Sequence, residues 1–242
     1  MKPDYQQAAK VANEVLAKSA NNMRALIILA NAMVFSDNIG TALKICDYIK
    51  KLYPDSNLGY KYAAEAYLKI DDKQNYHKQL KEAFERGQRD FDTTRNIYLL
   101  CQISGNRDEG IEYIERAYKE EENQHNHNFI SMYCGALYEN DILRFIDLFR
   151  KLYEIDPSTI NKFSLDTFIS STYENQEEID IKRARLMEKL DNLIDKGFKI
   201  DDLSKHFYHS IFFLAYHGRN NVNLRKKFAD FFIQANPDLT FT

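Results

Sequence analysis

Three histidines near the C-terminus, His206, His209 and His217, are the side chains whose type and spacing are best suited to chemistry. An imidazole donates or accepts hydrogen bonds and changes its charge near neutral pH. His206 and His209 are separated by three positions, which places two ligands on one helix face, but no third ligand is evident. No metal site is therefore predicted. The alternative for each histidine is an ordinary, partly exposed helix residue.

The remaining sequence offers little further chemistry. It has no glycine-rich phosphate turn, no lysine placed for a nucleotide and no pair of nucleophile and base. Cys46, Cys101 and Cys134 are far apart and fall where small interior residues are expected, so we interpret them as reduced core residues. The segment alone is not expected to catalyse a reaction or to hold a cofactor.

The elements that must position these side chains are helices in a repeating pattern of about 34 residues. In each repeat, small and apolar residues have the spacing of an amphipathic helix pair. Two successive sets are Leu29, Ala30, Met33, Ala42, Cys46 and Ile49, then Ala63, Ala64, Tyr67, Tyr76, Leu80 and Ala83. Such a period predicts helix pairs that bury their apolar faces only against neighbouring pairs.

The register of this pattern resembles the tetratricopeptide repeat (TPR), best in the unit from Met23 to Ser56. We therefore expect an all-α fold, an α-α superhelix that forms a TPR-like solenoid of antiparallel helix pairs. The expected divisions are a TPR-like array over residues 1–157, a divergent helical repeat over 158–203 and a helical linker over 204–242. Tyr98 occupies a position where the family has a small residue, which predicts wider helix spacing there.

In TPR proteins the first helix of each pair lines the concave surface. The resemblance implies that the residues lining the groove include Arg24, Asn31, Lys61, Lys69, Arg95, His127 and Tyr138. Their charges are mixed, and only Lys61, Lys69 and Arg95 could together clamp a carboxylate. The groove is predicted to bind a protein or peptide, and the alternative for any one of these residues is a solvated helix surface.

The segment from His209 to Gly218, HSIFFLAYHG, resembles the junction between repeats and catalytic region in O-GlcNAc transferase and SPINDLY-type glycosyltransferases, in particular their bacterial members. The resemblance implies a non-catalytic, acceptor-recognition domain of a transferase that uses a nucleotide sugar of the UDP type. His209 matches the catalytic histidine of that junction and would act only together with a catalytic domain. The competing hypothesis is a stand-alone TPR adaptor that binds a partner peptide or protein without sugar chemistry.

A stripe of aromatic residues near the C-terminus, Phe228, Phe231 and Phe232, lies on one side of the last expected helix. An exposed apolar stripe of this kind is typical of an interface. We expect it to contact a downstream catalytic domain or a second copy of the chain.

The net charge and the hydropathy of the chain limit the kinds of partner that it is expected to bind. The net charge of -3 and isoelectric point near 6.1 give no general attraction to nucleic acid. The longest apolar stretch, Ala25 to Phe35, is too short to span a bilayer, and the N-terminus lacks the apolar core of a secretion signal. A cytoplasmic location is expected.

Overall fold

The structure is a computed structural model that describes residues 4–138, 141–170, 173–200, 211–236 and 239. Every regular element in these residues is a helix, which confirms the all-α prediction. The chain divides into two compact units, residues 1–123 (unit 1) and 124–242 (unit 2), and each is described by itself.

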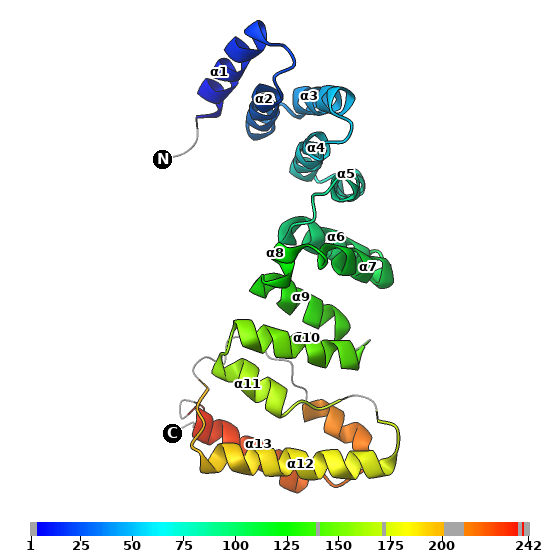
Figure 1. The fold of residues 1–242 in the computed structure, drawn as a ribbon, viewed down its shortest axis with the longest axis vertical. Coiled ribbons are helices and arrows are strands. Elements are labelled where there is room, and N and C mark those ends of the chain that lie inside the picture. The colour runs from blue at the N-terminus through cyan, green and yellow to red at the C-terminus, as the bar shows by residue number, and fades with distance from the viewer. Residues whose placement is uncertain (1–3, 139–140, 171–172, 201–210, 237–238, 240–242) are drawn as a thin grey trace. The chain divides into compact units, whose positions relative to one another are not determined.

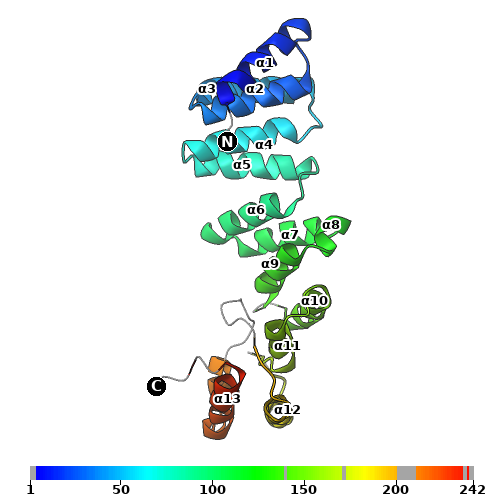
Figure 2. The ribbon, with the colours of Figure 1, turned by 90° about the vertical axis from the view of Figure 1, so that its left-hand side faces the viewer.

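Unit 1 is a stack of helix pairs (Figures 1 and 2). Its helices are α1 (Tyr5–Lys18), α2 (Met23–Phe35), α3 (Ile39–Leu52), α4 (Leu58–Lys69), α5 (Lys73–Glu85), α6 (Phe91–Ile103) and α7 (Arg107–Ala117), and the short α8 (Glu121–Gln124) ends one residue into unit 2. The pairs are α2 with α3, α4 with α5, and α6 with α7. We call α2, α4 and α6 the first helices and their partners the second helices.

Short polar side chains set the starts of several of these helices. The side chains of Asp4, Asn22, Asp72 and Asp90 each accept a bond from a backbone N–H three residues further on. Such caps satisfy N–H groups that have no partner within the helix.

The repeat is also visible in the backbone between first and second helices. Asp37, Asp71 and Gly105 recur at equivalent turns and have φ angles of 57°, 56° and 76°. Asp and Gly are among the residues that adopt this left-handed conformation most readily. A residue that adopts this left-handed conformation readily therefore recurs at the turn between the two helices of each pair.

Hydrogen bonds between side chain and backbone join the segment before each pair to the segment after it. Three such bonds, of 2.5–2.9 Å, run from Tyr53 to the carbonyl of Asn21, from Arg86 to that of Pro54, and from Asn123 to that of Arg89. Each bond joins residues about one repeat apart, so the same contact recurs at every pair of the array.

Small residues allow the helices of unit 1 to approach closely. Ala30, Cys46 and Ala63 are completely buried together between α2, α3 and α4. Tyr98, predicted to push its helices apart, lies against Gly110 on the second helix. A Cβ atom at Gly110 would lie 2.9 Å from Cδ2 of Tyr98, so the glycine makes the room that this ring needs.

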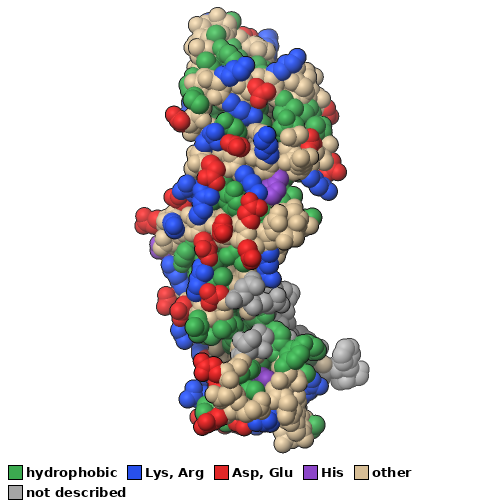
Figure 3. Space-filling model, turned by 90° about the vertical axis from the view of Figure 1, so that its right-hand side faces the viewer, with side chains coloured by type: hydrophobic (Ala, Val, Ile, Leu, Met, Phe, Trp, Pro, Cys, Tyr) green, Lys and Arg blue, Asp and Glu red, His purple; other side chains and the backbone are tan. Residues whose placement is uncertain are grey.

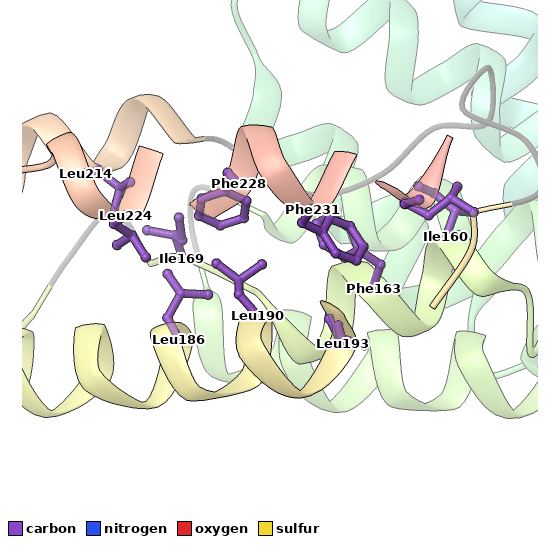
Figure 4. Packing of buried hydrophobic residues seen from close by; sticks show 12 residues of the cluster. Ile160, Phe163, Ile169, Leu186, Leu190, Leu193, Leu214, Leu224, Phe228 and Phe231 are labelled. Atoms are coloured by element: carbon purple, nitrogen blue, oxygen red, sulfur yellow. The ribbon is translucent and has the colours of Figure 1, made fainter. Parts of the chain in front are cut away.

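Unit 2 contains α9 (His127–Leu137), α10 (Ile142–Ile155), α11 (Thr159–Asp166), α12 (Gln176–Asp195), the 3₁₀ helix η1 (Ile211–His217) and α13 (Val222–Ala235). Its core is an aliphatic and aromatic cluster contributed by α11, α12, η1 and α13, together with Ile169 and Ile200 (Figure 4). Phe163 of α11 and Phe231 of α13 stack with ring centroids 4.6 Å apart. These helices bury their apolar faces against one another rather than against a further repeat.

The observed division differs from the one expected at residue 157. The pair α9 and α10 groups with the C-terminal helices because aromatic contacts join it to them: the Tyr138 ring lies 5.9 Å from Phe168 and 6.3 Å from Phe213. Of the expected linker, residues 204–210, 237–238 and 240–242 lie outside the described residues.

Candidate functional site

The first helices of unit 1 expose apolar side chains in a way that the second helices do not. Ile28 and Phe35 on α2, Leu68 on α4, and Leu99 and Ile103 on α6 are 38–83% exposed. Among the described residues of α3, α5 and α7, Tyr48 alone is a comparably exposed large hydrophobic side chain. We call the exposed side of α2, α4 and α6 the first-helix face.

Polar residues predicted to line the groove lie on the same helices. Lys61 and Glu65 are one helical turn apart on α4 and both are half-buried. Burial raises the pKa of Glu65, and the neighbouring charge of Lys61 partly offsets that rise. On α2, the amide oxygen of Asn31 is buried with no hydrogen-bond partner among the described residues.

The proposed carboxylate clamp of Lys61, Lys69 and Arg95 is only partly available. The ammonium of Lys69 lies 3.6 Å from a carboxylate oxygen of Asp37, and Lys61 has Glu65 as its neighbour. Arg24 and Arg95 are exposed, with no ion pair in the part of the chain that is described. The first-helix face is therefore mixed rather than strongly cationic. Figure 3, which views unit 1 from the side of its second helices, also shows both signs of charge interspersed with hydrophobic side chains there.

Two residues predicted for the groove, His127 and Tyr138, belong to unit 2. His127 begins α9, and its Nε2 lies 3.2 Å from a carboxylate oxygen of Asp156. The Tyr138 ring contacts Phe145 edge-on, with centroids 5.2 Å apart, as well as Phe168 and Phe213. Tyr138 thus contributes to an aromatic cluster inside unit 2.

The prediction of an interface at the phenylalanine stripe needs correction. Phe228 and Phe231 are 1% and 0% exposed, and Phe232 is half-buried against the same core. The stripe is covered within unit 2, chiefly by α11 and α12, because a helix face rich in phenylalanine is buried by whichever apolar face lies nearest. The burial of these side chains requires no contact with a further domain or with a second copy of the chain.

Of the three histidines of the C-terminal segment, the structure describes His217. His206 and His209 lie outside the described residues. His217 is 2% exposed, and its Nδ1 lies 3.3 Å from a guanidinium nitrogen of Arg183. Burial first, and then the charge of Arg183, lower the pKa of His217. A guanidinium only donates, so Nδ1 accepts and the neutral ring carries its proton on Nε2.

Arg183 itself is held by neutral groups. Its guanidinium donates to the side-chain oxygen of Asn221 and to the carbonyl of Asn220, both at 2.7 Å. Burial lowers the pKa of this guanidinium, while the charge of Asp180 acts in the opposite direction. Asp180 is itself engaged by Arg219 through two bonds of 2.8 and 2.9 Å. No sequence pattern indicated this role for Arg183, because the contacts span more than one repeat.

The cysteines are core residues, and one of them has polar neighbours. Burial raises the pKa of Cys46 to about 12 and raises that of Cys134 further. The sulfur of Cys101 lies 3.6 Å from Nε2 of His77 and 3.8 Å from Glu109, and burial raises the pKa of this thiol as well. All three stay protonated at neutral pH and are poor nucleophiles. Among the described residues no group of His, Cys, Asp and Glu is placed to hold a metal ion.

Comparison with solved structures identifies the class of fold. The structure of YrrB, described as a TPR protein with an unusual peptide-binding site, aligns with a TM-score of 0.51 and 17% identity, covering 77% of this chain and 92% of YrrB. MamA aligns with a TM-score of 0.48 and 19% identity over 64% of this chain and 90% of its own. TTC0263, a TPR protein of Thermus thermophilus, gives 0.42 and 16% over 76% and 91%.

The likeness to YrrB shows that this chain has the fold of TPR-like helical-repeat proteins, as the sequence predicted. No protein-family profile matches the sequence. No curated protein matches it either. The comparisons give no support to the resemblance to glycosyltransferases. No described helix is long and apolar enough to cross a membrane.

The most exposed part of the first-helix face was not among the predicted groove residues. Leu68 and Ile103 are 53% and 83% exposed, although a helix of this type buries most of its leucine and isoleucine side chains. The signal was present in the repeat register, because both residues fall on the side of the first helix that faces away from the second helix.

Proposed function

We propose that this protein is an interaction module that binds an extended segment of a partner protein on the first-helix face of unit 1. The observation that carries the proposal is the concentration of exposed apolar side chains on α2, α4 and α6, compared with Tyr48 alone on the described second helices. Large apolar side chains that stay exposed on one surface favour association, because each contributes about 1.5–3 kcal/mol when it is fully buried.

The polar residues of the same face suit a peptide ligand. Lys61 and Glu65 offer a donor and an acceptor to a peptide backbone beside apolar contacts from Leu68 and Leu99. A shared fold does not establish a shared ligand. The peptide-binding site reported for YrrB supports the proposal only as a precedent on the same scaffold.

The acceptor-recognition role in a glycosyltransferase is not adopted. It depends on His209, which lies outside the described residues, and on an interface at the phenylalanine stripe, which is buried in unit 2. The adaptor hypothesis needs neither feature.

The test is to select peptides from a random phage-displayed library against the whole chain and to measure their affinities by fluorescence anisotropy. Leu68→Glu and Leu99→Glu should weaken binding at least tenfold, because each removes an apolar contact and buries a charge. Lys78→Glu, an exposed change on the second helix α5, should leave the affinity within twofold. Equal losses for α4 and α5 variants, or a library without binders, would contradict the proposal.

A further inference from the structure

Unit 2 contains a cleft that is lined in part by Arg183 and His217. Its volume is about 540 Å³, and its long walls come from α10 and α12, with residues 168–170 after α11 between them. Ligand sites in proteins commonly have volumes of about 300–1,000 Å³. The cleft therefore has the size of a binding site, and its two long walls differ in chemistry.

The α10 wall is apolar apart from Arg150, whose guanidinium pairs with Asp147 at 2.8 Å. Ile142, Leu143, Ile146 and Phe149 line the cleft at the spacing of one helical surface. Leu143 is 73% exposed, whereas Phe149 is completely buried and forms the floor. An apolar side chain entering from solvent would thus meet apolar atoms from the rim of the cleft to its base.

The α12 wall is cationic. Lys182, Arg185 and Lys189 line the cleft, with Leu186 between them. They lie three, four and seven positions apart, which places them on one face of the helix. With a rise of about 1.5 Å per residue, the row of three cations extends over about 10 Å.

These positive charges are poorly compensated. Arg185 and Lys189 are exposed and have no ion pair in the described part of the chain. Of the two acids that line the cleft, Glu178 lies 3.8 Å from Lys182 and Asp166 pairs with Lys162 outside it. The guanidinium of Arg183, at the end of the same wall, is held by the neutral groups of Asn220 and Asn221.

We propose that this cleft binds an acidic peptide segment in extended conformation, in which carboxylate and apolar side chains alternate. Successive side chains of an extended chain point in opposite directions, so the carboxylates would face α12 while the apolar side chains face α10. Carboxylates two residues apart are separated by about 6.7 Å, so two of them fit along the row of cations.

Other ligand chemistries match the two walls less well. A fatty acid carries one carboxylate and would leave most of the cationic row unpaired. A nucleic-acid backbone would use the cations but would place charged groups against Leu143 and Ile146. The chain as a whole has a net charge of -3, so attraction of an acidic peptide must come from this local arrangement.

The proposal does not depend on the first-helix face, and its test separates the two. The probe is a fluorescein-labelled peptide with blocked ends, Glu-Phe-Glu-Leu-Glu, titrated with the whole protein at low and at physiological salt. Comparison probes are Lys-Phe-Lys-Leu-Lys, dodecanoate as a competitor, and a labelled uridine oligonucleotide. Leu68→Glu in unit 1 should leave binding of the acidic peptide unchanged.

The matched variants are two double charge reversals at exposed positions. Arg185→Glu with Lys189→Glu changes the cationic wall, and Arg225→Glu with Lys226→Glu makes the same change on α13 outside the cleft. We expect the first pair to weaken binding at least tenfold, the second to change it less than twofold, and Leu143→Ser to weaken it severalfold. The affinity of the wild type should fall as salt rises. Circular dichroism verifies that each variant is folded.

Three results would overturn the proposal. The acidic peptide could fail to bind at millimolar concentration, or it could bind equally well to the variant with Arg185 and Lys189 reversed. Dodecanoate or the oligonucleotide could bind more tightly than the peptide and show the same dependence on these two residues, which would assign the cleft to that ligand instead.

Discussion

Replacing Phe231 by alanine tests whether the phenylalanine stripe of α13 is internal core. Phe231 is 0% exposed and stacks on Phe163, with ring centroids 4.6 Å apart and planes at 2°. Phe→Ala in a core costs about 3–5 kcal/mol through lost transfer energy and the cavity left behind. A stacked aromatic pair contributes about 0.5–1.5 kcal/mol beyond buried area, which places Phe231→Ala toward the upper part of that range.

The neighbouring residue provides the control. Ile233 is 47% exposed on the same helix, so Ile233→Ala should stay within about 0.5 kcal/mol of the wild type. Urea unfolding gives the free energies, and amide hydrogen exchange followed by mass spectrometry locates the change. The lost protection should appear in α11, α12 and α13, because these helices share the core of Phe231, and unit 1 should remain protected.

An interface would give a different result. If Phe231 contacted a second copy of the chain, the alanine variant would keep its stability and change its sedimentation coefficient. That outcome, or equal effects of Phe231→Ala and Ile233→Ala, would refute the packing described for unit 2.

Packing, burial and charge lead to three further predictions. Gly110→Ala should destabilise the protein by up to about 2 kcal/mol in thermal or urea unfolding, because its Cβ would lie 2.9 Å from the ring of Tyr98 and overpacking outweighs the gain in helix propensity. Gly40→Ala has nothing within 4 Å of its Cβ and should stabilise the protein by up to about 1 kcal/mol. Equal stabilisation by the two variants would contradict this packing of Tyr98 on Gly110. The three cysteines should resist iodoacetamide at pH 8 until the protein is unfolded, as measured by intact mass, because burial keeps their thiols protonated; rapid labelling of the native protein would show that a thiol is accessible. A hydrogen bond from Arg116 lowers the pKa of Glu85 below its ordinary value of 4.5. The bond therefore stabilises the folded protein above pH 4.5, and this stabilisation is lost as the pH falls through the lowered pKa of Glu85. The wild type should therefore lose more stability than Glu85→Gln below pH 4.5 in pH-dependent urea unfolding, and parallel curves would show that the bond does not matter.

The helix pairs of unit 1 could be predicted because each pair repeats the same local code. Small residues such as Ala30 and Ala63 recur at close helix contacts, and Asp37 and Asp71 mark equivalent turns, so a sequence pattern is enough to place them. The accommodation of Tyr98 could not be predicted in this way. It depends on the glycine of another helix, which the pattern of one helix does not reveal.

The C-terminal half shows the limits of periodicity more clearly. The sequence pattern predicted an apolar face on α13. A periodic pattern indicates that a helix face is buried, but it does not indicate which other element covers that face. The stacking of Phe231 on Phe163 and the bonds from Arg183 to Asn220 and Asn221 join residues far apart in sequence. The start of α12 at Gln176 follows from the Asn175 cap and the acidic first turn.

The most direct test of the proposed function is amide hydrogen exchange of the whole chain with and without a peptide selected from the library. If the first-helix face binds the peptide, added protection within unit 1 should concentrate in α2, α4 and α6, where side chains such as Leu68, Leu99 and Ile103 are exposed. Protection confined to α3, α5 and α7, or no change in unit 1, would contradict the account.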